Sequence, residues 1–218
     1  MKATKEFIST NNATIIGVIS SDFTFSHEKI GEKFYEGFVS VKRTSGVIDQ
    51  VLVMISEKSG YTLEKGYQGS YVKITGSFRS YNERTDKSQK NKLVLSLFVK
   101  TIEFLTDSDD RTNMNTITLI GTICKPPVFR TTWFSHRKIT DLMLAVNRPY
   151  GHSDYIPCIC WGRNAQFAAG LPIGSYVSLK GFIQSREYSK KITETETEIR
   201  TAYEISVYSI EVHSESQD

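Results

Sequence analysis

The chain lacks the motifs that identify most enzymes. Its 218 residues include only three cysteines, and none of them forms a C-x-x-C pair of the kind that binds zinc. The four histidines are dispersed, and the sequence has neither a GxxxxGK[ST] loop for phosphates nor an HExxH segment for zinc. No serine or cysteine lies in a nucleophile motif. We therefore expect a protein that is not an enzyme and that needs no metal or other cofactor.

Long apolar runs are missing as well. The opening residues, MKATKEFISTNNAT, have no continuous apolar core like that of a signal peptide, and no stretch reaches membrane-spanning length. An odd number of cysteines cannot pair completely, which favours a reducing compartment. These absences predict a cytoplasmic protein without a membrane partner.

Positive and negative charges nearly balance. The chain has 27 lysines and arginines against 24 aspartates and glutamates, a formal net charge of +3. This weakly basic balance permits a polyanionic partner but does not require one. The hydrophobic fraction of 39% is ordinary for a globular protein that buries a core. Bulk composition therefore does not identify a partner.

What the sequence does contain is an internal repeat. GSYVKITGSF begins at Gly69, and GSYVSLKGFI begins 105 residues later at Gly174. The same offset aligns VKRTSGVIDQVLVMI with VNRPYGHSDYIPCIC, and ATIIGVI matches ITLIGTI at an offset of 104. Because the spacing is kept over three blocks, we infer a duplication. In the second block the copies share four residues: Val41/Val146, Arg43/Arg148, Gly46/Gly151 and Asp49/Asp154.

The boundary between the copies lies in TDSDDRTNM, a polar, acidic stretch without apolar periodicity, which is typical of an exposed linker. We predict a first domain over residues 1–105, a linker over 106–113, a second domain over 114–213 and a short tail over 214–218.

Each copy reads as a series of β-strands. An alternating apolar strand is followed by a longer irregular strand, a third strand, a short connector and two further strands. In the second copy Asn164 can cap a helix over residues 165–169, which Gly170 and Pro172 can end. Five strands with a short helix between the third and fourth describe the OB-fold barrel. We therefore predict an all-β protein of two tandem OB-fold barrels, with glycines at the tight bends of the strands: Gly17, Gly76, Gly121 and Gly181.

With these motifs in hand, the second copy resembles the bacterial single-stranded DNA-binding proteins. The segments that carry the resemblance are MNTITLIGTICKPPVFR, LAVNR, IPCICWGRNAQFA and GSYVSLKGFIQSREY, in the family's order. The first copy is looser, and the whole chain is similar to the two-domain members. The resemblance implies binding of single-stranded DNA without sequence preference and its protection in replication, recombination or repair. It also implies a homodimer with four OB folds and a nucleoid-associated location in the cytoplasm.

The segment DYIPCICWG suggests how such binding works. With a period of two, Ile156, Cys158 and Cys160 share one face, whereas Tyr155 and Trp161 lie on the other. We predict that the first three pack inward and that the two rings stack bases, because every base has a π-face and stacking tolerates any sequence. The resemblance places two more rings, at Tyr188 and Tyr150. A tryptophan in a strand also occurs often in a core or a domain interface, and this alternative stays open.

Polar residues complete the predicted site. On the fourth strand Gln184, Arg186 and Tyr188 share one parity, and Arg148 and Arg163 flank the third strand. The first copy has Gln50 and Ser56 at the aligned ring positions, so we expect it to supply cationic attraction through residues that include a basic hairpin, RSYNERTDKSQKNK. The predicted nucleic-acid-binding residues are Trp161, Tyr155, Tyr188, Tyr150, Arg148, Arg163, Arg186, Gln184, Arg130, Lys42, Arg43, Arg79, Tyr81 and Arg84.

Alternatives of other classes remain at this stage. The pair of OB folds could instead dock onto a primosome or another replication protein, with the first copy making mainly protein contacts. RNA is a third option, because stacking does not exclude ribose. Trp133 is expected at a hairpin tip or an interface. The last residues, EVHSESQD, lack the acidic, phenylalanine-ended tip that recruits replication and repair enzymes in many members of the family. Recruitment by that route is therefore not expected.

Overall fold

Six strands form the first domain. The computed structural model describes residues 10–61, 66–84, 91–106, 114–133, 136–191 and 197–213. Five strands pair in a closed circuit, β1–β3–β4–β6–β5–β1, in which only the β4–β6 contact is parallel. β2 pairs with β3 outside this circuit. The strands are β1 (Asn11–Ile19), β2 (Thr24–Lys29), β3 (Glu32–Lys42), β4 (Ile48–Ser56), β5 (Tyr71–Arg84) and β6 (Asn91–Phe104).

The second domain repeats this circuit as β7–β9–β10–β12–β11–β7, again with one parallel contact, β10–β12. β8 pairs with β9 as β2 pairs with β3. The predicted all-β class is confirmed. The elements are β7 (Met114–Ile123), β8 (Val128–Thr131), β9 (Lys138–Asn147), β10 (Ser153–Trp161), α1 (Gly162–Ala169), β11 (Tyr176–Lys191) and β12 (Thr197–Val212).

The irregular second strand of each copy is a hairpin rather than one strand. Between β2 and β3 the chain turns at Ile30 and Gly31, whose φ angles are +53° and +68°. Two successive positive φ angles make a tight turn that matches the twist of the flanking strands. In the second domain the β8–β9 hairpin includes Trp133, which is 94% exposed and so lies at the predicted tip.

The connector between the third and fourth strands of the predicted barrel differs between the domains. In the second domain α1 begins at Gly162, earlier than predicted, and Asn164 does not cap it. The Asn164 amide instead donates to the Tyr208 carbonyl oxygen at 2.9 Å, because Asn164 already lies within the first turn. The short helix in the described part of the first domain's connector is a 3₁₀ helix, Glu57–Ser59.

The predicted glycine positions are tight contacts between strands. A Cβ on Gly17 would lie 2.3 Å from the Ser40 oxygen, and one on Gly121 would lie 2.4 Å from the Ala145 oxygen. These two glycines therefore lie where β1 meets β3 and where β7 meets β9, the contacts that close each circuit. Gly76 and Gly181 lie at register shifts of β5 and β11, where an added Cβ would likewise lie within 2.4 Å of a facing backbone oxygen.

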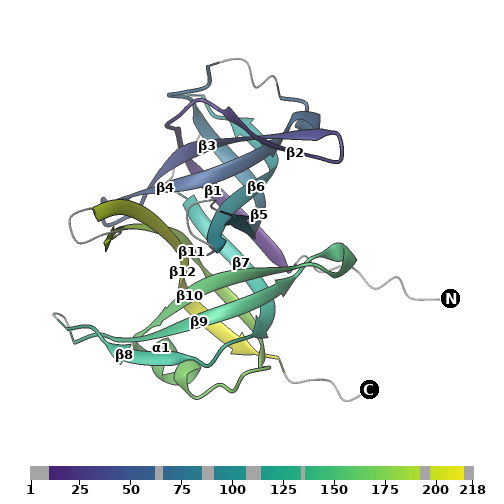
Figure 1. Ribbon diagram of the computed structural model, residues 1–218. Helices are drawn as coiled ribbons and strands as arrows, with labels where there is room; N and C mark the ends of the chain where they lie inside the picture. Colours follow the sequence, from purple (N-terminus) through teal and green to yellow (C-terminus); the bar gives the residue numbers. More distant parts are fainter. Residues whose placement is uncertain are drawn as a thin grey trace.

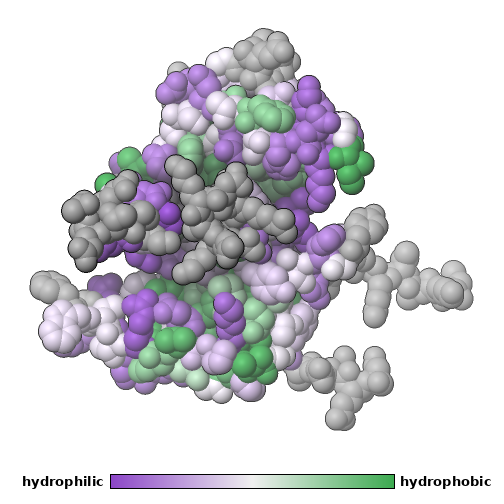
Figure 2. Space-filling view, in the orientation of Figure 1, coloured by the Kyte–Doolittle hydropathy of each residue, from purple (hydrophilic) through white to green (hydrophobic). Residues whose placement is uncertain are grey.

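The two domains share one sheet. β1 pairs antiparallel with β7, from Asn11 opposite Leu119 to Ile16 opposite Met114. Figure 1 shows the two barrels one above the other, with these strands between them. On the face shown in Figure 2, apolar side chains form separate small patches rather than one continuous surface. Within the described residues, no helix combines the length and apolarity that crossing a membrane requires.

Candidate nucleic-acid interface

Strand β10 has one buried face. Ile156, Cys158 and Cys160 are at most 2% exposed and belong to the core, so the predicted inward packing is confirmed. Burial raises the pKa of Cys160 to about 12 and raises that of Cys158 well above its ordinary value. Both thiols are therefore held in the neutral form, which is how a small apolar side chain behaves in a core.

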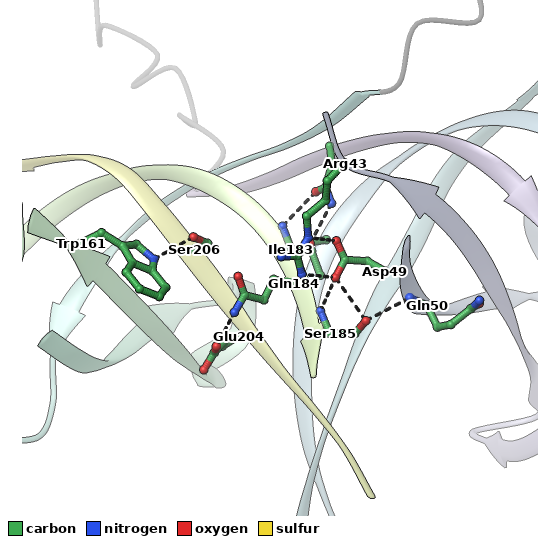
Figure 3. A network of polar contacts seen from close by, with 10 residues as sticks. Arg43, Asp49, Gln50, Trp161, Ile183, Gln184, Ser185, Glu204 and Ser206 are labelled. Atoms are coloured by element: carbon green, nitrogen blue, oxygen red, sulfur yellow. Dashed lines mark hydrogen bonds and ion pairs between the residues drawn. The ribbon is translucent and has the colours of Figure 1, made fainter. Parts of the chain in front are cut away.

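The opposite face of β10 carries the two rings. Tyr155 is 49% exposed, and Trp161 is partly buried. The Trp161 Nε1–H donates to the Ser206 hydroxyl at 3.0 Å, a contact drawn in Figure 3. Because Ser206 is itself 5% exposed on the neighbouring strand β12, this bond holds the indole in one orientation. Trp161 is therefore anchored at its polar edge and is not part of the core.

An open hollow lies beside the indole. Residues of β10, of α1 and of the segment that enters β9 line it: His136, Arg137, Lys138, Trp161, Gly162, Arg163 and Gln166. Arg137, Lys138 and Arg163 have no acidic partner among the described residues. A ring surrounded by unpaired cations suits a base with its phosphates, since the base stacks while the cations contact the backbone. We call this site the Trp161 hollow.

The predicted polar row on β11 lies on the same outer face of the second domain as Trp161. Gln184, Arg186 and Tyr188 stand opposite Glu204, Ala202 and Arg200 of β12. The Gln184 amide donates to Glu204 at 2.6 Å, so part of its hydrogen-bonding capacity is used within the protein. The Arg186 guanidinium lies 5.8 Å from the centroid of the Tyr188 ring, which is 38% exposed. This end of the row therefore offers a ring and a cation together.

Arg43 and Arg148 each pair with an aspartate of the same domain. Each donates from Nε and Nη2 to the two carboxylate oxygens of a buried aspartate, Asp49 for Arg43 and Asp154 for Arg148. The Arg43 bond to Asp49 raises the pKa of the guanidinium. These contacts give both arginines a structural role but use only Nε and Nη2, so the predicted phosphate contact stays a prediction. Arg130 is similarly paired with Asp141, at 2.7 Å, but on the surface.

The two aspartates also join the domains, and we call the two groups the Asp49 cluster and the Asp154 cluster. The Ser185 backbone N–H donates to Asp49 at 2.7 Å, and the Gln50 N–H donates to the Ser185 hydroxyl at 3.0 Å (Figure 3). The Asp154 cluster repeats the pattern with Ser80, whose N–H donates to Asp154 at 2.5 Å. The Ser80 hydroxyl accepts from the Tyr155 N–H at 2.8 Å. Each carboxylate therefore fixes the main chain of the other domain.

On the outer face of the first domain, several apolar side chains pack against one another. Phe34 and Met54 are 9% and 3% exposed there, and His27 stacks on Phe34 with centroids 4.9 Å apart. Phe98 packs at 5.8 Å from Phe34, and Arg79 covers Phe98 at 3.7 Å. These side chains cover one another, whereas Phe38, four residues from Phe34 on the same face of β3, is 39% exposed. The described part of this surface therefore differs from the Trp161 hollow.

The remaining predicted residues are only partly placed. Lys42 is exposed at the end of β3, and Tyr81 is 39% exposed on β5. The side chains of Tyr150 and Arg84 lie outside the described residues, as does most of the basic hairpin of the first domain. Sequence reasoning missed Arg137 and Lys138. The signal was the adjacent pair in FSHRK, but only the fold brings it to Trp161.

Comparisons with known proteins agree with this geometry. Residues 114–212 match the profile of the Single-strand binding protein family. The "Single-stranded DNA-binding protein" of Clostridium tetani is 32% identical over 84 residues, which are 36% of this chain and 58% of that protein. "Single-stranded DNA-binding protein 3" of Clostridium acetobutylicum is 31% identical over the same shares. The chain thus spans less than two thirds of the length of these relatives.

A solved structure covers more of the chain. The wild-type single-stranded DNA binding protein from Thermus aquaticus aligns with 95% of this chain and 95% of its own, at a TM-score of 0.74 and 16% identity. A deletion mutant of that protein aligns similarly, at a TM-score of 0.68. At this identity the match concerns the fold, and it extends over both domains.

Proposed function

Because residues 114–212 form a domain of the single-strand binding protein family, we propose that this chain binds single-stranded DNA without strong sequence preference. It would protect the strand in replication, recombination or repair. The observation that supports this most directly is the Trp161 hollow, where an anchored indole lies among three cations that have no described acidic partner.

In this proposal bases stack on the second domain. Trp161, Tyr155 and Tyr188 supply the rings, and Arg137, Lys138 and Arg163 supply charge for phosphates. Tyr155 and Trp161 are six positions apart on one strand, which at about 3.3 Å per residue is about 20 Å, enough for several nucleotides. No group needs to change covalently, so the role is binding without catalysis.

The first domain would contribute charge and position rather than stacking. Part of its outer face is covered by its own side chains, which supports the expectation that cationic residues such as Lys42 act there. By analogy with the two-domain members of the family, we propose that two chains associate as a homodimer with four barrels. Such a protein would act in the cytoplasm, close to the nucleoid.

Tryptophan fluorescence tests the stacking role. In a Trp133→Phe background Trp161 is the sole indole, and titration with oligo-dT should quench its emission and salt should reverse the quenching. Trp161→Ala should weaken binding, measured by anisotropy of a labelled oligo-dT, by about 5- to 150-fold, since each stacked base contributes about 1–3 kcal/mol.

Trp161→Phe is the matched control, because it keeps a ring and should retain most of the affinity. An oligo-rU titration in parallel tests discrimination between DNA and RNA. If the full chain leaves oligo-dT unbound at low salt, or if Trp161→Ala binds as tightly as the parent, the proposal is wrong and the protein-docking alternative gains.

A further inference from the structure

The Asp49 and Asp154 clusters have the same geometry but different charge. Both lie at the junction of the domains, and both join an arginine and an aspartate of one domain to a serine of the other. The residues next to them differ. Beside the Asp154 cluster a cross-strand pair consists of Arg79 and Ser96, whereas the aligned pair beside the Asp49 cluster consists of Gln184 and Glu204.

Because of these pairs, the side chains around the Asp154 cluster and those around the Asp49 cluster carry opposite net charge. Arg79 and Arg148 face a single carboxylate, that of Asp154, which leaves an excess of one positive charge among the described side chains. On the other side Arg43 faces both Asp49 and Glu204, which leaves an excess of one negative charge. Figure 3 shows the Gln184–Glu204 contact between the Trp161–Ser206 pair and the Asp49 cluster.

Arg79 is the residue that makes the Asp154 side cationic. Its guanidinium lies 3.7 Å from the centroid of the Phe98 ring, which orients it. Among the described residues it has no hydrogen-bond acceptor and no ion-pair partner. Burial, with the charge of Arg148 close by, lowers the pKa of the Arg79 guanidinium from its ordinary value. A half-buried, oriented cation of this kind can bind a negatively charged ligand.

The position of Tyr155 connects this cation to the base-stacking face. Tyr155 follows Asp154 directly, and its N–H donates to the hydroxyl of Ser80, the neighbour of Arg79. Arg148 donates to the Ser80 carbonyl oxygen at 3.0 Å. The exposed ring of β10, Arg79 of β5 and Arg148 of the β9–β10 turn therefore lie around the Ser80–Asp154 contact.

We propose that Arg79 of the first domain and Arg148 of the second form a binding site for one backbone phosphate of a single strand. The site is incomplete in either domain alone. It directs a strand that leaves Tyr155 across the Asp154 side of the junction. This inference rests on the proposed function, because the phosphate belongs to the strand bound on β10.

The salt dependence of oligo-dT binding by the full chain tests the site. Arg79→Gln places at position 79 the residue type that stands at the aligned position 184. Because each phosphate contact to a single strand contributes about 0.7 to the slope of log K against log salt, Arg79→Gln should lower that slope by about 0.7. Lys73→Gln is the control, since it removes one cation from the same strand, at an exposed pair with Glu103.

Arg79→Lys separates the charge from the contact with Phe98. It keeps a cation but not the planar group, so it should retain the salt slope even if it lowers thermal stability. An unchanged slope in Arg79→Gln, or an equal decrease in Lys73→Gln, overturns the site while leaving wild-type binding intact. If Arg79→Gln fails to fold, loss of the slope in the folded Arg79→Lys protein overturns it instead. Absence of wild-type binding would refute the proposed function itself.

Discussion

Asp49 and Asp154 are the residues on which the arrangement of the two domains depends most directly. They are 0% and 1% exposed, and each accepts hydrogen bonds from a guanidinium of its own domain and from the main chain of the other. Removing a carboxylate from water costs several kcal/mol, so such a group is stable only where its oxygens are satisfied. The clusters provide these partners, which makes them sensitive to any single change.

Asp154→Asn should destabilise the protein by about 3–5 kcal/mol, because it leaves Arg148 without its counter-charge and turns an amide N–H₂ toward a donor. Urea unfolding followed by circular dichroism measures the loss. The matched control is Asp141→Asn, which breaks the exposed pair with Arg130 and should cost at most about 1 kcal/mol. An equal decrease in the free energy of unfolding in both variants would show that the Asp154 cluster stabilises the fold no more than an exposed ion pair does.

At the scale of elements, β1 and β7 have two tasks at once. Each closes its own circuit, against β3 or β9, and the two strands also pair with each other across the domain boundary. The backbones approach closely at these closing contacts, which is why Gly17 and Gly121 lie there. The barrels and the junction between them are therefore mechanically connected through the same strands.

Gly121→Ala should separate β7 from β9, because the added Cβ would lie 2.4 Å from the Ala145 oxygen and the backbone cannot yield without loss of pairing. Overpacking of this kind costs about 1–3 kcal/mol or more, measured as a fall in the urea midpoint. Gly66→Ala is the control, since its nearest atom would lie at 3.8 Å, in ordinary contact. A Gly121→Ala midpoint equal to that of the control contradicts this account of closure.

For the whole molecule, the duplication has produced two barrels with similar strand pairing and different surfaces. The second presents an anchored indole beside an open hollow, whereas the first covers the corresponding face with Phe34, Met54 and Phe98. The shared sheet and the two aspartate clusters hold these unlike surfaces in a fixed relation. In the proposed function, a DNA strand bound by one barrel would therefore meet the other barrel at a defined place.

This fixed relation predicts that the domains unfold together. Scanning calorimetry of the full chain should give one transition, with a calorimetric enthalpy close to the van't Hoff value. The double variant Asp49→Asn/Asp154→Asn should broaden or split that transition, because it weakens both clusters while leaving each core intact. Two resolved transitions in the parent protein would mean that the junction contributes little to stability.

The sequence by itself determined the duplication, the all-β class and the inward face of β10. Each of these depends on local spacing: the offset of 105 between the copies, the period of two around Cys158 and Cys160, and glycines within apolar strands. The sequence also showed that Arg43 and Asp49 recur as Arg148 and Asp154, but not which residues they contact. A repeated arginine reads equally as a phosphate ligand or as a partner in an ion pair.

Only the tertiary structure shows which residues these arginines and aspartates contact. The Asp49–Ser185 and Asp154–Ser80 contacts join residues 136 and 74 positions apart, on different domains, and no local pattern encodes such a pairing. The same holds for the Trp161 hollow, whose cations come from separate elements, and for Arg79, which has no ion-pair partner among the described residues of the junction. Secondary structure follows from neighbours along the chain, whereas a binding surface follows from which distant side chains the closed barrels bring together.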